Sequence, residues 1–353
     1  MRIFTNMQAP IVTALSSFGM SGRLFHAPFI QAHPAFKLAG AWQRNSNSIE
    51  EQFPEAVRYK AFEEILQHPD IELVVVNTPT STHFELAKAA LLAGKHVLVE
   101  KAFTTNLKEA LELQQLAAEK KRVLTVFQNR RYDSDFKLVQ SVVEEQPAGA
   151  WLEGCIRFER YKPALSPKTH KETPTPGAGL WMDLGPHILD QALQLFGKPQ
   201  SVSAEMRQFR PGTQVDDWFQ VLLHYSNKCI TLKGSLLVKD PMPAYQFHGM
   251  NGSFTKSRAD VQETQLLTGM SPLHEFYGVE PDTEAGKLVL FNNGHDLVRT
   301  IPAPKGNYLQ FYDELAQAIR HNATAPVTMQ QAADVMQLLE LVPIAVKSGI
   351  QHL

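Results

Sequence analysis

The sequence predicts an α/β protein built from two parts, a doubly wound parallel sheet followed by a domain whose sheet is antiparallel or mixed. Its 353 residues correspond to roughly two domains of about 150 residues each. In the first third, short apolar runs alternate with helical patterns, which is typical of buried parallel strands covered by helices on both faces. Beyond residue 130, strand patterns follow one another without helices between them, which indicates antiparallel neighbours.

The first part contains five strand patterns and four helical patterns. The run at 73–76 is the most apolar, and the helix at 83–93 stops at Gly94, a residue type favoured just past helix ends. Because such strands are buried on both faces, the handedness and order rules give a doubly wound sheet. The predicted strands are 11–15, 36–42, 73–76, 96–99 and 123–127, and the predicted helices are 22–32, 61–67, 83–93 and 107–120.

The second part contains a loop rich in Pro, Lys and Thr at 162–176, and then a helix and a series of strands. Thr328 precedes Met329-Gln330-Gln331, which is an N-cap signal for the last helix. We expect a division into a domain of residues 1–128 and a domain of residues 129–353. The predicted elements after the loop are a helix at 180–195, strands at 202–209, 218–225, 230–238 and 245–248, and helices at 308–321 and 328–347.

Composition narrows the functional classes. Lys plus Arg number 34 and Asp plus Glu number 36, so the net charge is −2, which leaves no electrostatic footprint for nucleic acid or an anionic membrane. No run approaches the ~18 apolar residues of a membrane span, and the apolar run at 11–15 is too short for a signal peptide. Cys155 and Cys229 each lie in an apolar stretch, so we expect buried, reduced thiols and a cytoplasmic protein.

A glycine-bearing turn joins the first predicted strand to the first helix. It reads Ser17-Phe18-Gly19-Met20-Ser21-Gly22, a degenerate form of the Gly-x-Gly-x-x-Gly fingerprint of the Rossmann fold. Gly19 lets the backbone approach a pyrophosphate, and Gly22 permits close packing of helix on strand. A plain tight turn is the alternative, but the position favours a dinucleotide-binding turn formed by Ser17, Phe18, Gly19, Met20 and Gly22.

The end of the second strand bears on the choice of dinucleotide. An acidic residue there would hold the 2′-hydroxyl of NAD, but the chain reads Trp42-Gln43-Arg44-Asn45-Ser46. The guanidinium of Arg44 pairs well with a phosphate. The pattern therefore favours NADP over NAD, with a solvated loop arginine as the alternative interpretation of Arg44.

Three polar stretches are predicted to meet at one edge of the first sheet. Thr78-Pro79 and Glu100-Lys101 each follow a buried strand, where ligands bind in open α/β sheets. Asp183 and His187 lie four residues apart on one face of a predicted helix. Imidazole is suited to accept a hydroxyl proton, and a lysine beside it stabilises a developing alkoxide. Taken one at a time, Lys101 could be a surface lysine, Asp183 a helix cap and His187 a histidine packed in the core. No third residue at metal-ligand spacing accompanies Asp183 and His187, which disfavours a metal site.

Five segments carry a more specific resemblance. They are 17–28 (SFGMSGRLFHAP), 77–83 (NTPTSTH), 93–101 (AGKHVLVEK), 127–133 (FQNRRYD) and 183–197 (DLGPHILDQALQLFG). On these motifs the chain resembles the glucose-fructose oxidoreductase, inositol dehydrogenase and rhizopine-catabolism (Gfo/Idh/MocA) family over nearly its whole length. The runs Asn129-Arg130-Arg131 and Arg160-Tyr161-Lys162-Pro163 are similar to the branch that contains NADP-dependent scyllo-inositol dehydrogenases.

The resemblance implies a Rossmann domain and a C-terminal α+β domain with an open, mainly antiparallel sheet that forms a homodimer or homotetramer. It also implies catalytic positions: His187 as general base, Lys101 as the group that polarises the substrate or relays its proton, and Asp183 as a substrate-positioning residue. The residues expected around the nicotinamide ring and its ribose are Thr78, Pro79, His83, Glu100 and Asn129.

Two positions depart from the family pattern. Ala102 stands where the family usually has the proline of Glu-Lys-Pro, and Ser17 stands where it has the first glycine. Substrate contacts are expected from the loop 162–176 and from four side chains, namely Arg131, Tyr132, Tyr161 and Trp181.

The sequence thus predicts an NAD(P)-dependent oxidoreductase that interconverts a secondary alcohol and a ketone on a sugar, polyol or cyclitol. Two other classes fit the same fold. One is an NAD-dependent glycosidase, in which the hydride is returned within each turnover. The other is a non-catalytic regulatory protein that binds a dinucleotide, which the presence of Lys101, Asp183 and His187 disfavours.

Overall fold

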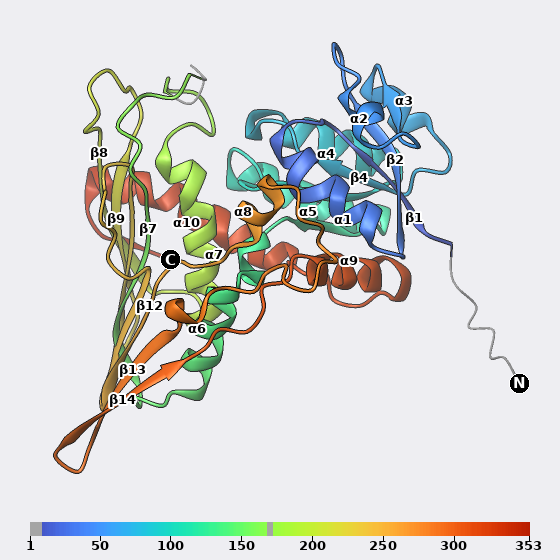
Figure 1. Cartoon of the computed structure of the whole chain (residues 1–353). Helices are drawn as coiled ribbons and strands as arrows, with labels where there is room; N and C mark the ends of the chain where they lie inside the picture. The colour runs from blue at the N-terminus through green and yellow to red at the C-terminus, as the bar shows by residue number, and fades with distance from the viewer. Residues whose placement is uncertain (1–8, 168–171) are drawn as a thin grey trace, which may run out of the picture.

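Two β-sheets lie on opposite sides of a helical layer (Figure 1). The computed structural model describes residues 9–167 and 172–353. Residues 1–8 of the first predicted domain and residues 168–171 of the predicted loop therefore lie outside the described residues. Within the described ranges, the prediction of a parallel α/β sheet followed by a mainly antiparallel one is confirmed.

The first sheet is the Rossmann sheet, and its six strands run in the order β3-β2-β1-β4-β5-β6. Every neighbouring pair is parallel. All four residues of β4 are buried, as expected for a central strand that is covered on both faces. The strands are β1 (Ile11–Leu15), β2 (Phe36–Trp42), β3 (Val57–Tyr59), β4 (Leu73–Val76), β5 (His96–Val99) and β6 (Leu124–Val126).

Helices connect these strands and cover the sheet. The predicted helix at 22–32 is in fact a π-helix, η1 (Gly22–His26), continued by α1 (Ala27–Ala32). Helix α5 (Leu107–Lys120) is capped by the side chain of Asn106, which accepts from the N–H of Glu109. The other helical segments in this half are α2 (Ser48–Gln52), α3 (Phe62–Gln67), η2 (Thr80–Thr82), α4 (His83–Leu92), η3 (Asn129–Tyr132) and α6 (Ser134–Glu145).

The second sheet has nine strands in the order β14-β13-β12-β11-β7-β10-β9-β8-β15. The pair β7 and β10 is parallel, and the other neighbouring pairs are antiparallel. The strands are β7 (Trp151–Glu159), β8 (Ser201–Arg207), β9 (Trp218–His224), β10 (Cys229–Ser235), β11 (Tyr245–Gly249), β12 (Gly252–Lys256), β13 (Gly286–Asn292), β14 (His295–Ile301) and β15 (Gln351–His352).

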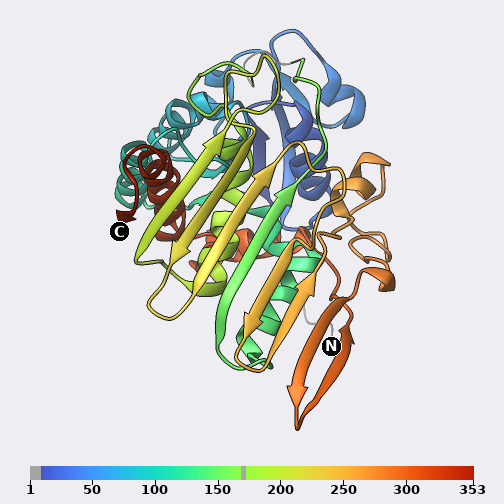
Figure 2. The same ribbon diagram turned by 90° about the vertical axis from the view of Figure 1, so that its left-hand side faces the viewer.

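One face of this second sheet packs on helices, and the other faces outward. Helix α7 (Leu180–Phe196) contacts β7, β9 and β10, and α10 (Met329–Ser348) contacts β8. Figure 2 shows the opposite face bare of helices within the described residues, with the β13–β14 hairpin extending beyond the rest of the sheet. This half also contains α8 (Gln262–Leu267) and η5 (Asp282–Glu284).

The chain returns to the first sheet near its end. Helix α9 (Leu309–His321) packs on α1, and Arg320 pairs with Glu72 at 2.6 Å. Helix α10 then begins at the predicted N-cap, Thr328, whose side chain accepts from the N–H of Gln331 in a full capping box. Because the last helices bridge both halves, the division at residue 128 stays a prediction.

The expectation that both cysteines are buried needs correction. Cys229 was expected to be buried but is exposed, whereas Cys155 is partly buried; both are free thiols. Cys229 is the first residue of β10, and the two-residue period of the strand turns Ile230 inward and Cys229 outward. Strand β14 is absent from the predicted elements. Six of its seven residues are exposed, so its sequence lacks the apolar alternation that indicates a strand.

Candidate active site

The glycine-bearing turn has room for a dinucleotide phosphate. A methyl group built on Gly22 would lie 2.7 Å from the carbonyl oxygen of Ser17, so glycine is needed there for the helix to pack on the strand. A methyl group on Gly19 would meet no atom within 4 Å. Gly19 therefore faces open space at the start of a helix, where free backbone N–H groups can bind a pyrophosphate. Phe18 is buried, with its ring edge-on to Phe53, and Met20 is 57% exposed.

Ser17 has a specific role in place of the first glycine. Its hydroxyl donates to the carbonyl oxygen of Asn77 at 2.9 Å, and its N–H donates to the side-chain oxygen of Asn77 at 3.0 Å. The Asn77 amide in turn donates to the carbonyl oxygen of Ser17. These bonds tie the end of β1 to the end of β4 and hold the turn in place.

Two arginines lie together at the end of β2. Arg44 is exposed, with its guanidinium 5.9 Å from the Trp42 ring centroid. Arg58, on neighbouring β3, donates to the carbonyl oxygens of Gln43 and Arg44 at 3.0 and 2.6 Å. Sequence reasoning missed Arg58, because only the pairing of β3 with β2 brings it to this corner.

Lys101 and Asp183 meet across the two halves of the molecule. Nζ of Lys101 lies 2.8 Å from the backbone carbonyl oxygen of Asp183 and 3.2 Å from its Oδ1. Both residues line a cavity of about 820 Å³ that also includes Thr78, Pro79 and Arg160. The Lys101–Ala102 peptide bond is cis. The carboxyl edge of the first sheet and the start of α7 thus enclose one site, as expected for an open α/β sheet.

His187 lies one helical turn beyond Asp183 on α7 and is only 6% exposed. Burial, followed by the charges of Lys101 and the nearby arginines, holds the pKa of this imidazole well below its ordinary value. Its Nδ1 is buried and has no hydrogen-bond partner among the described residues. The imidazole is therefore neutral at pH 7 and able to accept a proton.

Glu100 belongs to a buried chain of hydrogen bonds. Its Oε1 lies 3.1 Å from Nε2 of His26, and its Oε2 accepts from the N–H of Lys101 at 3.1 Å. Nδ1 of His26 lies 2.9 Å from the hydroxyl of Tyr312. Burial raises the pKa of Glu100, but the hydrogen bond and charge of His26 outweigh that effect, and the pKa is lowered.

His83 is fully buried and holds backbone. Its Nε2 lies 2.8 Å from the carbonyl oxygen of Thr78, and its Nδ1 lies 2.9 Å from that of Ala102. It therefore joins the loops that follow β4 and β5, both of which carry residues of the cavity. Asn129, on η3, is also buried; neither side chain is among those that line the cavity.

The four side chains expected to contact substrate do not line the cavity. Arg131 makes a two-pronged ion pair with buried Asp190 at 2.6 and 2.8 Å, and Tyr132 donates to Glu314 at 2.6 Å. Trp181 is 2% exposed, and its indole N–H donates to the carbonyl oxygen of Leu339. Tyr161 is exposed beside the cavity. Its neighbours in sequence, Arg160 and Lys162, line the cavity instead, together with residues 163–167, 172, 175 and 176 of the predicted loop.

Asp216 is a cavity residue without a sequence signal. Its Oδ2 accepts from the N–H of Trp181 at 2.6 Å and so caps the start of α7. A methyl group on Gly179 would lie 2.1 Å from Asp216 Oδ1, so glycine is required at this N-cap. Burial raises the pKa of Asp216 to about 6. The carboxylate lies 35 residues downstream in a loop, and no local pattern predicts that it reaches α7.

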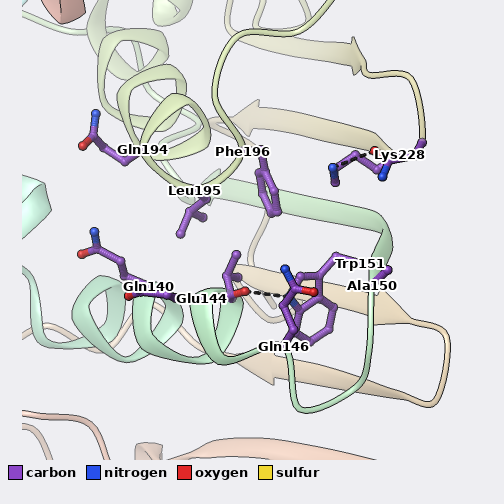
Figure 3. A pocket seen from close by; sticks show the side chains of 11 residues that line it. Gln140, Glu144, Gln146, Ala150, Trp151, Gln194, Leu195, Phe196 and Lys228 are labelled. Carbon is purple, nitrogen blue, oxygen red and sulfur yellow. Dashed lines mark hydrogen bonds between the residues drawn. The ribbon is translucent and has the colours of Figure 1, made fainter.

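A second hollow, of about 600 Å³, lies where α6 and α7 end (Figure 3). Its lining is mainly amide and apolar side chains, and Trp151 beneath it donates to the carbonyl oxygen of Val143 at 3.1 Å. The titratable side chains in the lining are Glu144 and Lys228. It includes none of the predicted catalytic residues, so the first cavity is the candidate active site.

The described part of the chain contains no cluster of three or more His, Cys, Asp or Glu side chains arranged to hold a metal ion. Among its helices, none combines the length and apolar character that a membrane span needs.

A Rossmann sheet with a phosphate-binding turn has at its carboxyl edge a cavity lined by Lys101 and Asp183, with the buried His187 one helical turn beyond Asp183. These features define a dinucleotide-dependent dehydrogenase or reductase. Comparison with known proteins identifies the family. Residues 17–128 match the model of its NAD-binding Rossmann fold, and residues 157–350 match that of its C-terminal alpha/beta domain. The chain belongs to the Gfo/Idh/MocA family of oxidoreductases.

Several relatives resemble the chain over almost its whole length. The uncharacterised oxidoreductase YdgJ of Escherichia coli is 36% identical, over 95% of this chain and 96% of its own. The scyllo-inositol 2-dehydrogenase (NADP(+)) IolW of Bacillus subtilis is 32% identical, over 94% of this chain and 92% of its own. The solved structure of the Bacillus subtilis oxidoreductase yvaA has a TM-score of 0.94 at 32% identity and covers 98% of this chain and 99% of its own.

Proposed function

We propose that the protein interconverts a secondary alcohol and a ketone on a sugar, polyol or cyclitol, with NADP as the dinucleotide. The observation that carries the proposal is the junction of Lys101 and Asp183, with His187 one turn away on α7, at the carboxyl edge of the Rossmann sheet. When bound, the nicotinamide ring accepts a hydride from the substrate carbon or returns one to it.

The residues of the chain then handle the proton. His187 accepts the hydroxyl proton as the alcohol is oxidised, because its lowered pKa keeps it neutral at pH 7. Lys101 stabilises the developing negative charge on the oxygen. Asp183 accepts hydrogen bonds from the Lys101 ammonium through both its backbone carbonyl and its carboxylate. The same carboxylate accepts hydrogen bonds from substrate hydroxyls. In the reverse direction His187 returns the proton to the ketone oxygen.

The choice of NADP rests on the corner at the end of β2. Arg44 presents a guanidinium there, and Arg58 fixes the loop through two carbonyl bonds. A phosphate on the ribose 2′ position would meet two cations at this corner. The name of the similar protein IolW includes NADP(+) and scyllo-inositol, which supports both the dinucleotide and the cyclitol class.

We further propose that copies of the chain form a homodimer or homotetramer through the outer face of the second sheet. Among the residues that the structure describes, no helix covers that face (Figure 2). Exposed apolar side chains of β13 and β14 lie at its edge, including Phe291 and Val298. Light scattering on the purified protein measures the assembly. Free thiols at Cys155 and Cys229 support a reducing cytoplasm as its location.

A panel of substrates tests the function. The purified protein is mixed with NADP⁺ or NAD⁺ and a set of inositols, alditols and aldoses, and nicotinamide absorbance is followed in both directions. Turnover of a member with NADP⁺ supports the proposal. Tight dinucleotide binding without turnover of any member would favour a regulatory protein, and release of a glycoside without net NADPH would favour a glycosidase.

A further inference from the structure

Arg160 is a cation of the active-site cavity that the proposed proton chemistry does not use. It follows the last residue of β7 and lines the cavity with Lys101 and Asp183. Its guanidinium carbon lies 4.6 Å from the ring centroid of Phe158, which is buried. Within the described ranges, no side chain or carbonyl makes a hydrogen bond or ion pair with this guanidinium.

Two other arginines stack on the same phenyl ring, and both are bound. Arg130, 5.0 Å from the ring centroid, pairs with Asp133 and Glu263 at 3.1 Å each. Arg258, 4.3 Å from the centroid, donates to the hydroxyl of Tyr245 and to the carbonyl oxygen of Arg157, each at 3.0 Å. Arg160 alone of these three is left without a protein acceptor among the described residues.

The carboxylates of the cavity are already engaged. Glu172 accepts from Arg210 and Thr213 at 2.9 Å each, and from the N–H of Ser166 at 2.8 Å. Asp216 accepts from the start of α7, and Asp183 is held by Lys101. Lys162, an exposed residue of the lining, adds a second cation without a described side-chain partner. The cavity therefore presents more positive than negative charge to a ligand.

We propose that Arg160 binds a negatively charged group of the substrate, a carboxylate or a phosphate monoester, so that an acidic sugar is preferred to its neutral counterpart. Arg160 presents a planar fork of N–H donors, which matches either anion in a two-pronged geometry. A partly buried guanidinium gains most from such a partner, because the low dielectric strengthens the pair. This inference rests on the proposed function and narrows its substrate class.

The position of Arg160 places the anion next to the reacting centre. The His187 ring lies next to the same phenyl ring as Arg160, tilted to it, with its centroid 6.4 Å from that of Phe158. Arg160 is also close enough for its charge to contribute to the lowered pKa of His187. An acidic group held by Arg160 and a hydroxyl held by His187 and Lys101 would belong to one small molecule. Arg160 is thus a specificity-determining residue at the proposed site.

Binding and turnover are measured separately. The full chain saturated with NADP⁺ is titrated calorimetrically with matched probes: glucose, glucuronate, gluconate and glucose 6-phosphate. Turnover of each is followed by nicotinamide absorbance. We expect at least one acidic probe to bind about tenfold or more tightly than glucose, and the carboxylate and phosphate arms identify which anion is preferred.

Variants isolate the role of Arg160. Arg160→Gln is expected to reduce affinity for the preferred acid about tenfold or more and to reduce the affinity for glucose by clearly less, and Arg160→Lys is expected to recover part of the loss of acid binding. The matched control is Lys239→Gln, which also removes one positive charge, but at an exposed lysine whose Nζ lies 5.8 Å from the Tyr161 ring centroid. Added salt is expected to weaken acid binding in the wild type but not in Arg160→Gln.

The two proposals fail in different ways. Equal binding of acids and glucose by the wild type, or an unchanged acid affinity in Arg160→Gln, overturns the role of Arg160 even if neutral polyols are oxidised. Absence of turnover with every probe, while acids still bind through Arg160, counts against the proposed oxidoreductase substrate class and leaves the anion site supported.

Discussion

Nε2 of His26 lies 3.1 Å from a carboxylate oxygen of Glu100, in a place where the imidazole is completely buried. The hydroxyl of Tyr312 donates to the carbonyl oxygen of Phe25 at 2.8 Å, so Nδ1 of His26 must itself donate to Tyr312. Nε2 and the carboxylate then face each other and must share one further proton. The pair fixes Glu100, which accepts from the N–H of Lys101.

The first prediction concerns this shared proton. His26→Leu is expected to lower the rate of hydride transfer about tenfold or more, because Glu100 then loses its partner and no longer orients the backbone of Lys101. His26→Gln, which can still donate to Glu100, is expected to recover part of the rate. Thermal denaturation separates this role from loss of stability: the rate should fall in His26→Leu at temperatures where the variant is still fully folded, and an undiminished rate there would contradict the role.

The second prediction separates the two glycines of the phosphate-binding turn. Gly19→Ala is expected to keep the melting temperature and to weaken dinucleotide binding by at least tenfold, because its methyl group enters open space that the phosphate needs. Gly22→Ala is expected to lower the melting temperature, because its methyl group would lie 2.7 Å from the Ser17 carbonyl oxygen. Fluorescence titration and thermal denaturation measure the two effects, and equal behaviour of the variants would contradict the assignment.

The third prediction concerns the dinucleotide preference. Arg44→Ser is expected to weaken NADP binding roughly tenfold or more, since a hydrogen bond to a charged group contributes about 1.5–3 kcal/mol, and to leave NAD binding unchanged. Arg44→Asp should shift the preference further toward NAD. Lys37→Ser is the control, because it removes an exposed cation from the other end of β2. An unaltered NADP/NAD ratio in both Arg44 variants would refute the argument.

The fourth prediction concerns the proton-handling groups. His187→Asn and Lys101→Met are each expected to reduce kcat by about 10²–10⁴, the usual range for loss of general acid–base catalysis, with dinucleotide affinity retained. Because the pKa of His187 is lowered, alcohol oxidation by the wild type should persist below pH 6.5 and decline only as His187 becomes protonated at lower pH. Full turnover in His187→Asn would remove it as the base.

The fifth prediction concerns acid stability. Burial, then the charge of Arg122, lowers the pKa of His96 from 6.5 to about 4, while Glu72 opposes and Arg320 adds to the shift. Nδ1 of His96 accepts from the N–H of Val123 at 2.9 Å, so the folded protein needs this ring neutral. In the unfolded chain His96 binds a proton as the pH falls below 6.5, whereas in the folded chain it binds one only near pH 4. The free energy of unfolding therefore decreases as the pH falls from 6.5 to about 4.

His96→Asn keeps an acceptor for Val123 and has no proton to gain. At about pH 5 the wild type is expected to lose about 2 kcal/mol through His96. The variant should therefore lose less of its free energy of unfolding between about pH 7 and 5, as measured by urea denaturation at each pH. An equal loss in the two proteins would contradict the assignment to His96.

Five of the six Rossmann strands were predictable because their apolar runs are buried in the sheet, whereas the edge strand β3, with exposed Val57, was not predicted. The run at 73–76 has no polar residue, so its pattern predicts a fully buried strand, and β4 occupies those four residues. The family motifs likewise led to the junction of Lys101 with Asp183 and to His187. These motifs are local runs of sequence at the ends of elements, where the fold determines which runs meet.

The remainder depended on contacts that no local pattern contains. Arg58 reaches the end of β2 only because β3 pairs there, and Asp216 reaches α7 from a separate loop. Trp181 and Arg131 were both expected to contact substrate. The position of Trp181 on α7 instead turns its indole toward Leu339, and Asp190 engages Arg131 in the interior.

The return of α9 to the first sheet has a mechanical consequence. The chain leaves the Rossmann sheet after β6, comes back as α9 beside α1, and leaves again along α10 (Figure 1). Two bodies joined by several passes of chain can bend about the line of those passes but resist swivelling around it. We therefore expect any opening of the active-site cavity to be hinge-like, and a single cut in one connecting segment not to release either half.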